Sequence, residues 1–307
     1  ASVLLFSGDV SFVNVPKISD MEKITSLLQN AGVTVTRDLD VARMQIGDIA
    51  SSVIDKKTAG LFRASIILTG SILARTGTVT FPPPGGCVIG KRPIDIFLSG
   101  YEKMGATVAV SDDGEQFHIT APEGGLRGAE ILFRIPSVTA TETLLMAAVL
   151  AHGDSTLYNA AMEPEIVGLA KALKKSGAHI EGIGTPTLHI KGTGGVPLTY
   201  SGTEPHRIIP DRIEAGSFAI LGALCAHELT ITNCAPEDLR LPLAMLEDCG
   251  VQIEVTKDTI HIRNNTQANT ELKPCSIRTH EYPGFQTDMQ APFGILATQA
   301  TGESIVE

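Results

Sequence analysis

The sequence predicts an α/β fold in which buried helices lie inside and strands lie outside. Two observations predict it. A pattern of helix, glycine and strand recurs four times at an interval of about 73 residues. A second kind of helix, apolar nearly all round, recurs at the same interval, and such helices are buried on all sides. We therefore expect repeated units that pack these apolar helices together and place their strands on the outside.

The first kind of helix is amphipathic and ends at a glycine that leads directly into a β-branched strand. Glycine at this point supplies the left-handed backbone that ends a helix. The four glycines are Gly32, Gly105, Gly177 and Gly250. An interval this regular indicates repeated copies of one folding unit.

The second kind of helix is rich in Ala, Gly and Ser, and a short alternating strand follows each copy. The copies span residues 63–77, 141–153, 214–228 and 289–302, and residues 1–8 read as the last turns of another. We expect a three-repeat domain at 1–205, with its first helix truncated, and an incomplete second domain at 206–307, with repeat four and the start of repeat five. The Gly- and Pro-rich stretch TGGVPLTYSGTEPHR suits the crossing between them.

Composition excludes several classes of protein. The formal net charge of −10 argues against a general nucleic-acid or anionic-membrane surface. The longest apolar runs are too short to span a bilayer, and no basic, apolar leader opens the chain. The five cysteines show no CxxC pair, which indicates reduced thiols in a cytoplasm. The eight histidines lack metal-ligand spacing, so we expect no structural metal.

One loop combines features of a reactive site. Residues 81–95 read FPPPGGCVIGKRPID, so three prolines and two glycines precede Cys87, with Lys91 and Arg92 close behind. Such a run predicts a pre-shaped lid, and nearby cations favour the reactive thiolate. From the residues alone, a small apolar cysteine filling the loop is an equal alternative.

Six segments in order resemble the UDP-N-acetylglucosamine 1-carboxyvinyltransferase family of enolpyruvyl transferases, over essentially the whole chain. They are RASIILTGSILAR, PGGCVIGKRPID, PSVTATETLLMAA, EPEIVGLAKALKKSGA, IPDRIEAGSFAI and YPGFQTDMQAPF. The resemblance implies two inside-out α/β barrel domains of three repeats each. It implies transfer of the enolpyruvyl group of phosphoenolpyruvate to the 3′-hydroxyl of UDP-N-acetylglucosamine in the cytoplasm, the first committed step of peptidoglycan synthesis. It implies no cofactor, a monomer, and a cysteine attacked by the epoxide fosfomycin.

The resemblance also assigns site residues. It implies that Cys87 is catalytic, as proton donor or as an adduct site, and that Asp288 is the candidate base for the sugar hydroxyl. An ordinary helix N-cap is the alternative for Asp288. The substrate-binding residues that it implies are Arg63, Arg92, Pro93, Ile94, Asp95, Ile96, Ser137, Val138 and Ile305.

The candidate residues Arg63, Ser137 and Asp288 share a position just before an apolar helix. Asp211 and Arg212, a possible hinge ion pair or a solvated helix start, share it too. If the helices of each domain are parallel, their positive N-terminal ends converge on one face. Two such faces around a gap would bind anionic substrates despite the negative net charge.

Some residues depart from the pattern of this family, and alternative functions stay open. Ile135, Thr139 and Met162 stand where some family members have lysine, glycine and arginine. The family's Lys-Asn pair and C-terminal arginines fall outside the 307 residues, so we expect the chain alone to be nearly inactive. The buried helices of the second domain lack partners, so we also expect exposed apolar surface that makes the chain prone to association. Three alternatives stay open: the shikimate-pathway enolpyruvyl transferase, a non-catalytic nucleotide-sugar binding paralogue, and a nucleic-acid enzyme of related architecture.

Overall fold

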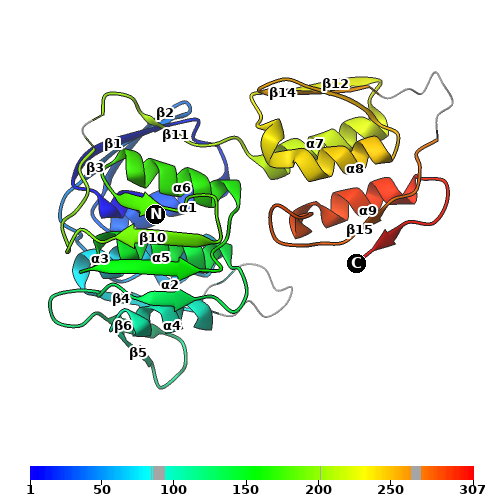
Figure 1. The fold of residues 1–307 in the computed structure, drawn as a ribbon. Helices are drawn as coiled ribbons and strands as arrows, with labels where there is room; N and C mark the ends of the chain where they lie inside the picture. Colours follow the sequence, from blue (N-terminus) through cyan, green and yellow to red (C-terminus); the bar gives the residue numbers. More distant parts are fainter. Residues whose placement is uncertain (84, 86–93, 201, 264–270) are drawn as a thin grey trace. The chain divides into compact units, whose positions relative to one another are not determined.

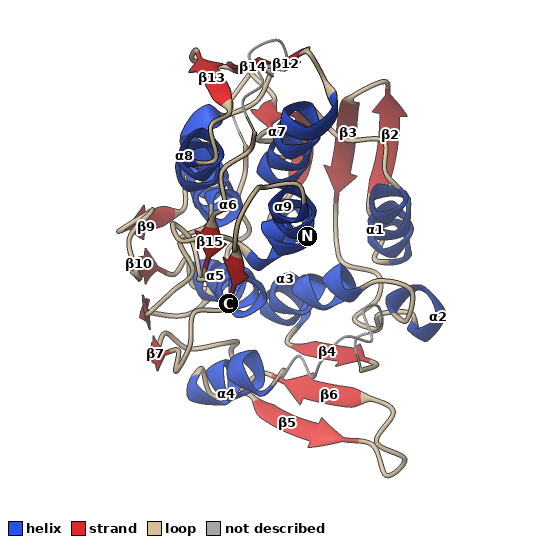
Figure 2. Cartoon of the chain, turned by 90° about the vertical axis from the view of Figure 1, so that its right-hand side faces the viewer, coloured by secondary structure: helices blue, strands red, loops and turns tan. Residues whose placement is uncertain are grey.

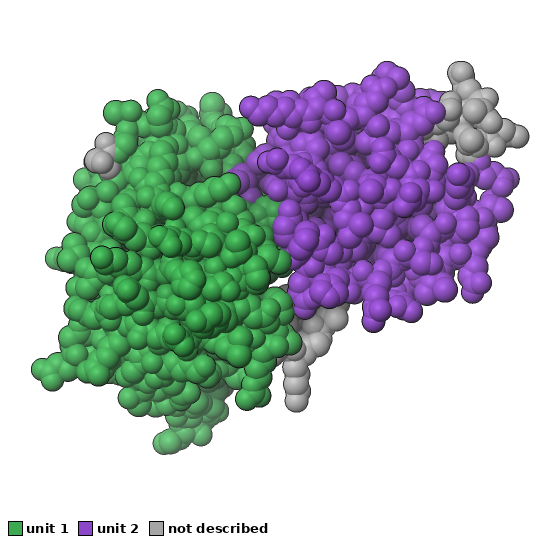
Figure 3. All heavy atoms as spheres, in the orientation of Figure 1, with its two compact units in different colours: residues 1–208 green, residues 209–307 purple. Residues whose placement is uncertain are grey.

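The computed structural model describes residues 1–307 except 84, 86–93, 201 and 264–270. The chain divides into two compact units, Ala1–Ile208 and Ile209–Glu307 (Figure 3). The division follows Ile208 rather than residue 205, because β11 (His206–Arg207) pairs in parallel with a strand of unit 1. The numbers of whole repeats that we predict for each domain stay a prediction.

Unit 1 holds three copies of one element order: apolar helix, strand, amphipathic helix, then two strands (Figure 1). The first copy is η1 (Ser2–Leu5), β1 (Gly8–Val13), α1 (Ser19–Asn30), β2 (Thr34–Asp38) and β3 (Val41–Ile46). The second is η2 (Arg63–Ile67) with α3 (Leu68–Thr76), then β4 (Thr78–Phe81), α4 (Asp95–Lys103), β5 (Thr107–Val110) and β6 (Phe117–Thr120), preceded by the short α2 (Lys56–Ala59). The third is β7 (Glu130–Leu132), α5 (Val138–Leu150), β8 (Asp154–Tyr158), α6 (Pro164–Lys175), β9 (His179–Glu181) and β10 (Thr187–Lys191).

Unit 2 continues the same order. A fourth copy comprises α7 (Arg212–Cys225), β12 (Glu228–Thr232), η3 (Pro236–Leu239) with α8 (Arg240–Asp248), β13 (Gln252–Val255) and β14 (Thr259–Arg263). A fifth begins with β15 (Ser276–Ile277), η5 (Thr287–Met289), α9 (Gln290–Thr298) and β16 (Ile305–Val306). Figure 2 shows these helices and strands by type. No helix in the described ranges has both the length and the apolar character needed to cross a membrane.

The strands of each repeat form a small antiparallel sheet with the third strand in the middle. The strand orders are β11-β1-β3-β2, β4-β6-β5, β7-β8-β10-β9 and β12-β14-β13, with β15-β16 as a separate pair. Two sheets have an additional edge strand: β7 pairs in parallel with β8, and β11 pairs in parallel with β1. The α/β class with repeated units is confirmed, while the sheets of the described residues stay separate and do not close into one barrel.

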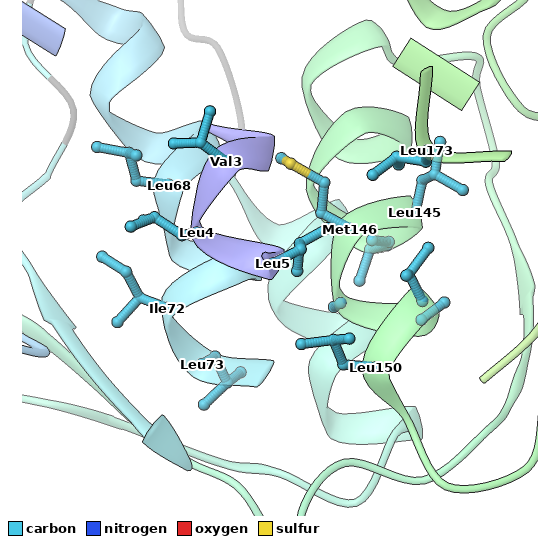
Figure 4. Packing of buried hydrophobic residues seen from close by; sticks show 14 of the residues in the cluster. Val3, Leu4, Leu5, Leu68, Ile72, Leu73, Leu145, Met146, Leu150 and Leu173 are labelled. Carbon is cyan, nitrogen blue, oxygen red and sulfur yellow. The ribbon is translucent and has the colours of Figure 1, made fainter. Parts of the chain in front are cut away.

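The apolar helices of unit 1 form the centre of its core. Ten of the side chains of α5 are buried, from Ala140 to Leu150, and α3 is buried from Leu68 to Leu73. In Figure 4, η1, α3 and α5 lie side by side and run in the same direction. The helices α3 and α5 approach closely at Gly70, where a Cβ atom would stand 2.1 Å from the carbonyl oxygen of Thr143. The prediction of helices inside is confirmed for this unit.

The glycines that end the amphipathic helices adopt the predicted backbone. Their φ angles are +96° at Gly32, +88° at Gly105, +98° at Gly177 and +93° at Gly250. This left-handed region is open to glycine without the steric cost that a Cβ atom brings. Each helix therefore stops at its glycine, and the chain turns at once into the next strand.

The apolar helices of unit 2 are buried on one face and exposed on the other, as expected for helices without a full set of partners. Phe218 and Leu221 of α7 are 47% and 49% exposed, and Ile295 of α9 is 60% exposed. The exposure follows from the number of apolar helices that pack together. In unit 2 the helices α7 and α9 pack against each other, whereas in unit 1 three apolar helical segments pack together. One face of each helix is left without a covering helix among the described residues.

Candidate functional site

The N-terminal ends of two apolar helices meet in unit 1. Ser137 precedes α5 in an extended conformation, and its Oγ accepts a hydrogen bond from the backbone N–H of Ala140 at 3.3 Å. Val138 is the first residue of the helix. Ser137 is therefore the N-cap, and the first turn of α5 presents the backbone N–H groups that favour an anion.

Arg63 lies at the same end of this helix layer. It is the first residue of η2, and η2 contacts α5. The predicted helix of 63–77 is correct in extent, but its first turn is a tighter 3-10 segment that passes into α3 at Leu68. The structure thus places Arg63 at the same end of the helix layer as Ser137 and Val138, as the parallel arrangement of repeats predicts (Figure 4).

The cysteine loop is the longest of four equivalent connections. Residues 82–94 join β4 to α4, while residues 14–18, 159–163 and 233–235 join the corresponding elements of the other repeats. Cys87, Arg92 and Pro93 lie outside the described residues. Ile94 and Ile96 pack partly buried against the core of unit 1, and Asp95 is exposed in the first turn of α4. The connection that contains Cys87 is therefore longer than the corresponding connection of each other repeat.

In unit 2, Asp288 is exposed within η5, and the structure does not make it a cap. The N-cap residues of η5 and α9 are Gln286 and Met289, and neither end has a side-chain capping hydrogen bond among the described residues. Asp211 is the residue that caps, because its Oδ1 accepts from the N–H groups of Ile213 at 2.9 Å and Glu214 at 3.0 Å. The helix-cap interpretation of Asp288 is therefore wrong.

This contrast predicts unequal effects of two aspartate substitutions on stability. Asp211→Ala removes a bifurcated cap and is expected to lower the free energy of unfolding of unit 2 by about 1 kcal/mol. Asp288→Ala removes an exposed carboxylate without a capping role and is expected to change it by less than about 0.5 kcal/mol. Urea unfolding monitored in unit 2 measures both. A loss at Asp288 equal to that at Asp211 would show that Asp288 has a structural role.

The N-terminal ends of α7 and α9 also lie near each other, since α7 contacts η5. Arg212 is buried at the start of α7, and its guanidinium lies 5.6 Å from the ring centroid of Tyr282. Ile305 is half exposed in β16, where it pairs with Ser276 of β15. The predicted gap between two converging faces involves both units and stays a prediction.

Sequence reasoning missed Glu142, a carboxylate in the second turn of α5. Burial, and after it the neighbouring carboxylates of Glu165 and Glu163, raises its pKa from 4.5 to about 7. The signal was present in TETLLMAAVLA, where one glutamate interrupts an apolar helix. A carboxyl that titrates near neutral pH therefore lies one turn from Ser137 and Val138.

No group of three or more His, Cys, Asp or Glu side chains able to hold a metal ion occurs within the described ranges. The candidate site residues are instead an arginine, a hydroxyl cap, helix N-termini and an exposed aspartate. This set is suited to phosphate and carboxylate groups.

Comparison with known proteins first identifies the class. The family model for EPSP synthase (3-phosphoshikimate 1-carboxyvinyltransferase) matches residues 2–307. The structure is similar to the enolpyruvyl transferase NikO from Streptomyces tendae, with a TM-score of 0.85 and 21% identity over 99% of this chain and 70% of that one. An EPSP synthase from Acinetobacter baumannii gives a TM-score of 0.68 at 15% identity with the same coverage. The fold is that of an enolpyruvyl transferase.

Sequence relatives then narrow the family. UDP-N-acetylglucosamine 1-carboxyvinyltransferases of Nostoc sp. strain PCC 7120 and Acidobacterium capsulatum are each 42% identical to the whole chain, which covers 67% and 69% of them. That of Campylobacter lari is 39% identical, with 71% of it covered. The chain belongs to the UDP-N-acetylglucosamine 1-carboxyvinyltransferase family within the wider EPSP synthase family. The predicted family resemblance is confirmed.

Proposed function

We propose that this protein transfers the enolpyruvyl group of phosphoenolpyruvate to the 3′-hydroxyl of UDP-N-acetylglucosamine and releases phosphate. The observation that carries the proposal is identity of 39–42% with relatives of that name along the whole chain. The reaction would serve as the first committed step of peptidoglycan synthesis. The odd number of cysteines, without a CxxC pair, supports a reducing cytoplasm, and we propose a monomer.

The chemistry is an addition followed by an elimination. An acid protonates the methylene carbon of phosphoenolpyruvate, the sugar oxygen adds to the neighbouring carbon, and phosphate then leaves as a proton is lost. We assign Cys87 to this centre, as acid or as adduct site, and Asp288 as the base for the sugar hydroxyl. The absence of a capping role for Asp288 supports that assignment, since its carboxylate is exposed and available.

Anion binding follows from the helix ends. We assign Arg63, Ser137 and Val138 to the substrates, because they lie at the N-terminal end of the buried helices of unit 1. Positive helix ends and a guanidinium hold phosphate and carboxylate groups in a protein whose net charge is negative. The further binding residues in this proposal are Arg92, Pro93, Ile94, Asp95, Ile96 and Ile305.

The acceptor distinguishes this proposal from its closest rival. The matching family model carries the name of the shikimate-pathway enzyme, whereas relatives at about 40% identity carry the name of the sugar-nucleotide enzyme. UDP-N-acetylglucosamine is expected to raise the melting temperature, and shikimate 3-phosphate is not. A rise with shikimate 3-phosphate alone would overturn the choice of acceptor.

Phosphate release, assayed on the 307-residue chain and on the product of its whole reading frame, separates an enzyme from a non-catalytic binding protein.

Fosfomycin is expected to alkylate Cys87 when UDP-N-acetylglucosamine is present. The thiolate attacks an epoxide carbon, the carbon–oxygen bond opens, and the released oxygen takes up a proton, which leaves a thioether. Peptide mass spectrometry locates the adduct, and Cys87→Ser should abolish it. Cys225, an exposed thiol on α7, is the internal control. Equal labelling of Cys225, or an unlabelled Cys87, would remove Cys87 from the proposed mechanism.

A further inference from the structure

Two cysteines of unit 2 that are distant in the sequence lie in contact. Cys249 follows the last residue of α8 and is fully buried in the core of the unit. Cys275 packs partly buried against the same core, and the two thiols are hydrogen-bonded. The backbone is joined beside them, since the N–H of Lys273 donates to the carbonyl of Cys249 at 3.0 Å.

The two thiols differ in their access to solvent. Cys275 is partly exposed, whereas Cys249 has no exposed surface. Burial, and after it the hydrogen bond with Cys275, raises the pKa of Cys249 to about 12. Cys249 therefore stays a protonated S–H donor, and Cys275 is the thiol that an oxidant in solution can reach.

We propose that Cys249 and Cys275 form a redox modification site, which a hydroperoxide converts into an intramolecular disulfide. The Cys275 thiolate attacks one peroxide oxygen, the oxygen–oxygen bond breaks, and the leaving oxygen is protonated to water or an alcohol. Cys275 is then a sulfenic acid. The Sγ of Cys249 displaces the hydroxyl group, its proton completes a water molecule, and the disulfide forms. Two electrons pass from the thiols to the peroxide.

The disulfide would connect two repeats. Cys249 ends the amphipathic helix of repeat four, and Cys275 directly precedes β15 of repeat five. The backbone N–H of Cys275 donates to Oγ of Ser304, the residue before β16. Oxidation would therefore attach the end of α8 to the β15–β16 pair. The site uses neither Cys87 nor Asp288, so it does not depend on the proposed function.

The test is hydrogen peroxide treatment of the native 307-residue chain in mildly alkaline buffer, followed by alkylation of free thiols and tryptic digestion without reduction. Cys249 falls in the peptide 241–257 and Cys275 in the peptide 264–278, since the Lys273–Pro274 bond resists trypsin. The expected product is these two peptides linked, with the mass of two hydrogen atoms missing. The linked species should disappear after reduction.

The variants separate the two roles. In Cys249→Ser the reaction should stop at a Cys275 sulfenic acid that dimedone traps, and in Cys275→Ser Cys249 should remain a thiol. Cys225→Ser, which removes an exposed thiol elsewhere in unit 2, should leave the linked peptides unchanged. The wild-type result is decisive even if a core variant fails to fold. Oxidation of Cys225 while Cys249 and Cys275 both stay reduced, or linkage of Cys275 to another cysteine, would overturn the proposal.

Discussion

Replacing Gly70 by alanine is expected to lower the free energy of unfolding of unit 1 by about 3 kcal/mol or more. The added Cβ would lie 2.1 Å from the carbonyl oxygen of Thr143 and 3.0 Å from its carbonyl carbon. Both atoms belong to the backbone of α5, so no side chain can rotate away. The helices α3 and α5 would have to separate along the centre of the core, which would loosen contacts such as that of Ser71 Oγ with Met146 Sδ at 3.3 Å.

Gly294 offers a matched control on an apolar helix of the other unit. It lies within α9, and an added Cβ would meet no described heavy atom within 4 Å. Gly294→Ala should therefore stabilise unit 2 by up to about 1 kcal/mol, through helix propensity alone. Urea unfolding followed by hydrogen exchange of peptides from α5 and from α9 reports each unit by itself. Similar small effects of the two substitutions would show that the close approach at Gly70 can relax.

Much of the fold could be predicted from the sequence because the determining signals are local and repeated. A glycine that must adopt a positive φ, as Gly105 does at +88°, marks a helix end without reference to the rest of the chain. An apolar helix rich in small residues indicates close packing, and Gly70 is a position where the helices α3 and α5 approach closely. The interval between repeats then predicts which helices are neighbours.

Local patterns could not predict which segment completes each sheet or covers each helix. His206 and Arg207 precede repeat four in the sequence but pair with β1 of repeat one, a choice that depends on a distant strand edge. In the same way, the apolar surface of α7 predicts burial, but Phe218 is exposed because burial requires a covering helix.

The candidate site shows the same division between local and distant information. Ser137 could be predicted as a helix start because a hydroxyl residue precedes an apolar run, and it does cap α5. Asp288 has the same local pattern and does not cap, because the chain enters α9 through a 3-10 turn. The titration of Glu142 depends first on its burial and then on Glu165 of α6 and its N-cap Glu163, which are near it only in the folded chain.

Glu142→Gln is expected to stabilise unit 1 at mildly alkaline pH by up to about 3 kcal/mol and to have little effect near pH 4. The pKa of Glu142 is raised from 4.5 to about 7 in the folded protein, and one unit of pKa corresponds to about 1.4 kcal/mol. The folded state therefore binds the proton more tightly than the unfolded state. The stabilising contribution of the protonated carboxyl is fully present below about pH 4.5, and it is lost as the pH rises through about 7.

The difference between variant and wild type at each pH is the quantity to measure, because the other titratable groups of the protein contribute equally to both. Urea unfolding of wild type, Glu142→Gln and Glu102→Gln, an exposed control on α4, should show a gain that grows between pH 5 and 8 only for Glu142→Gln. A gain that is constant with pH would show that Glu142 is ionised throughout and that burial does not control its protonation.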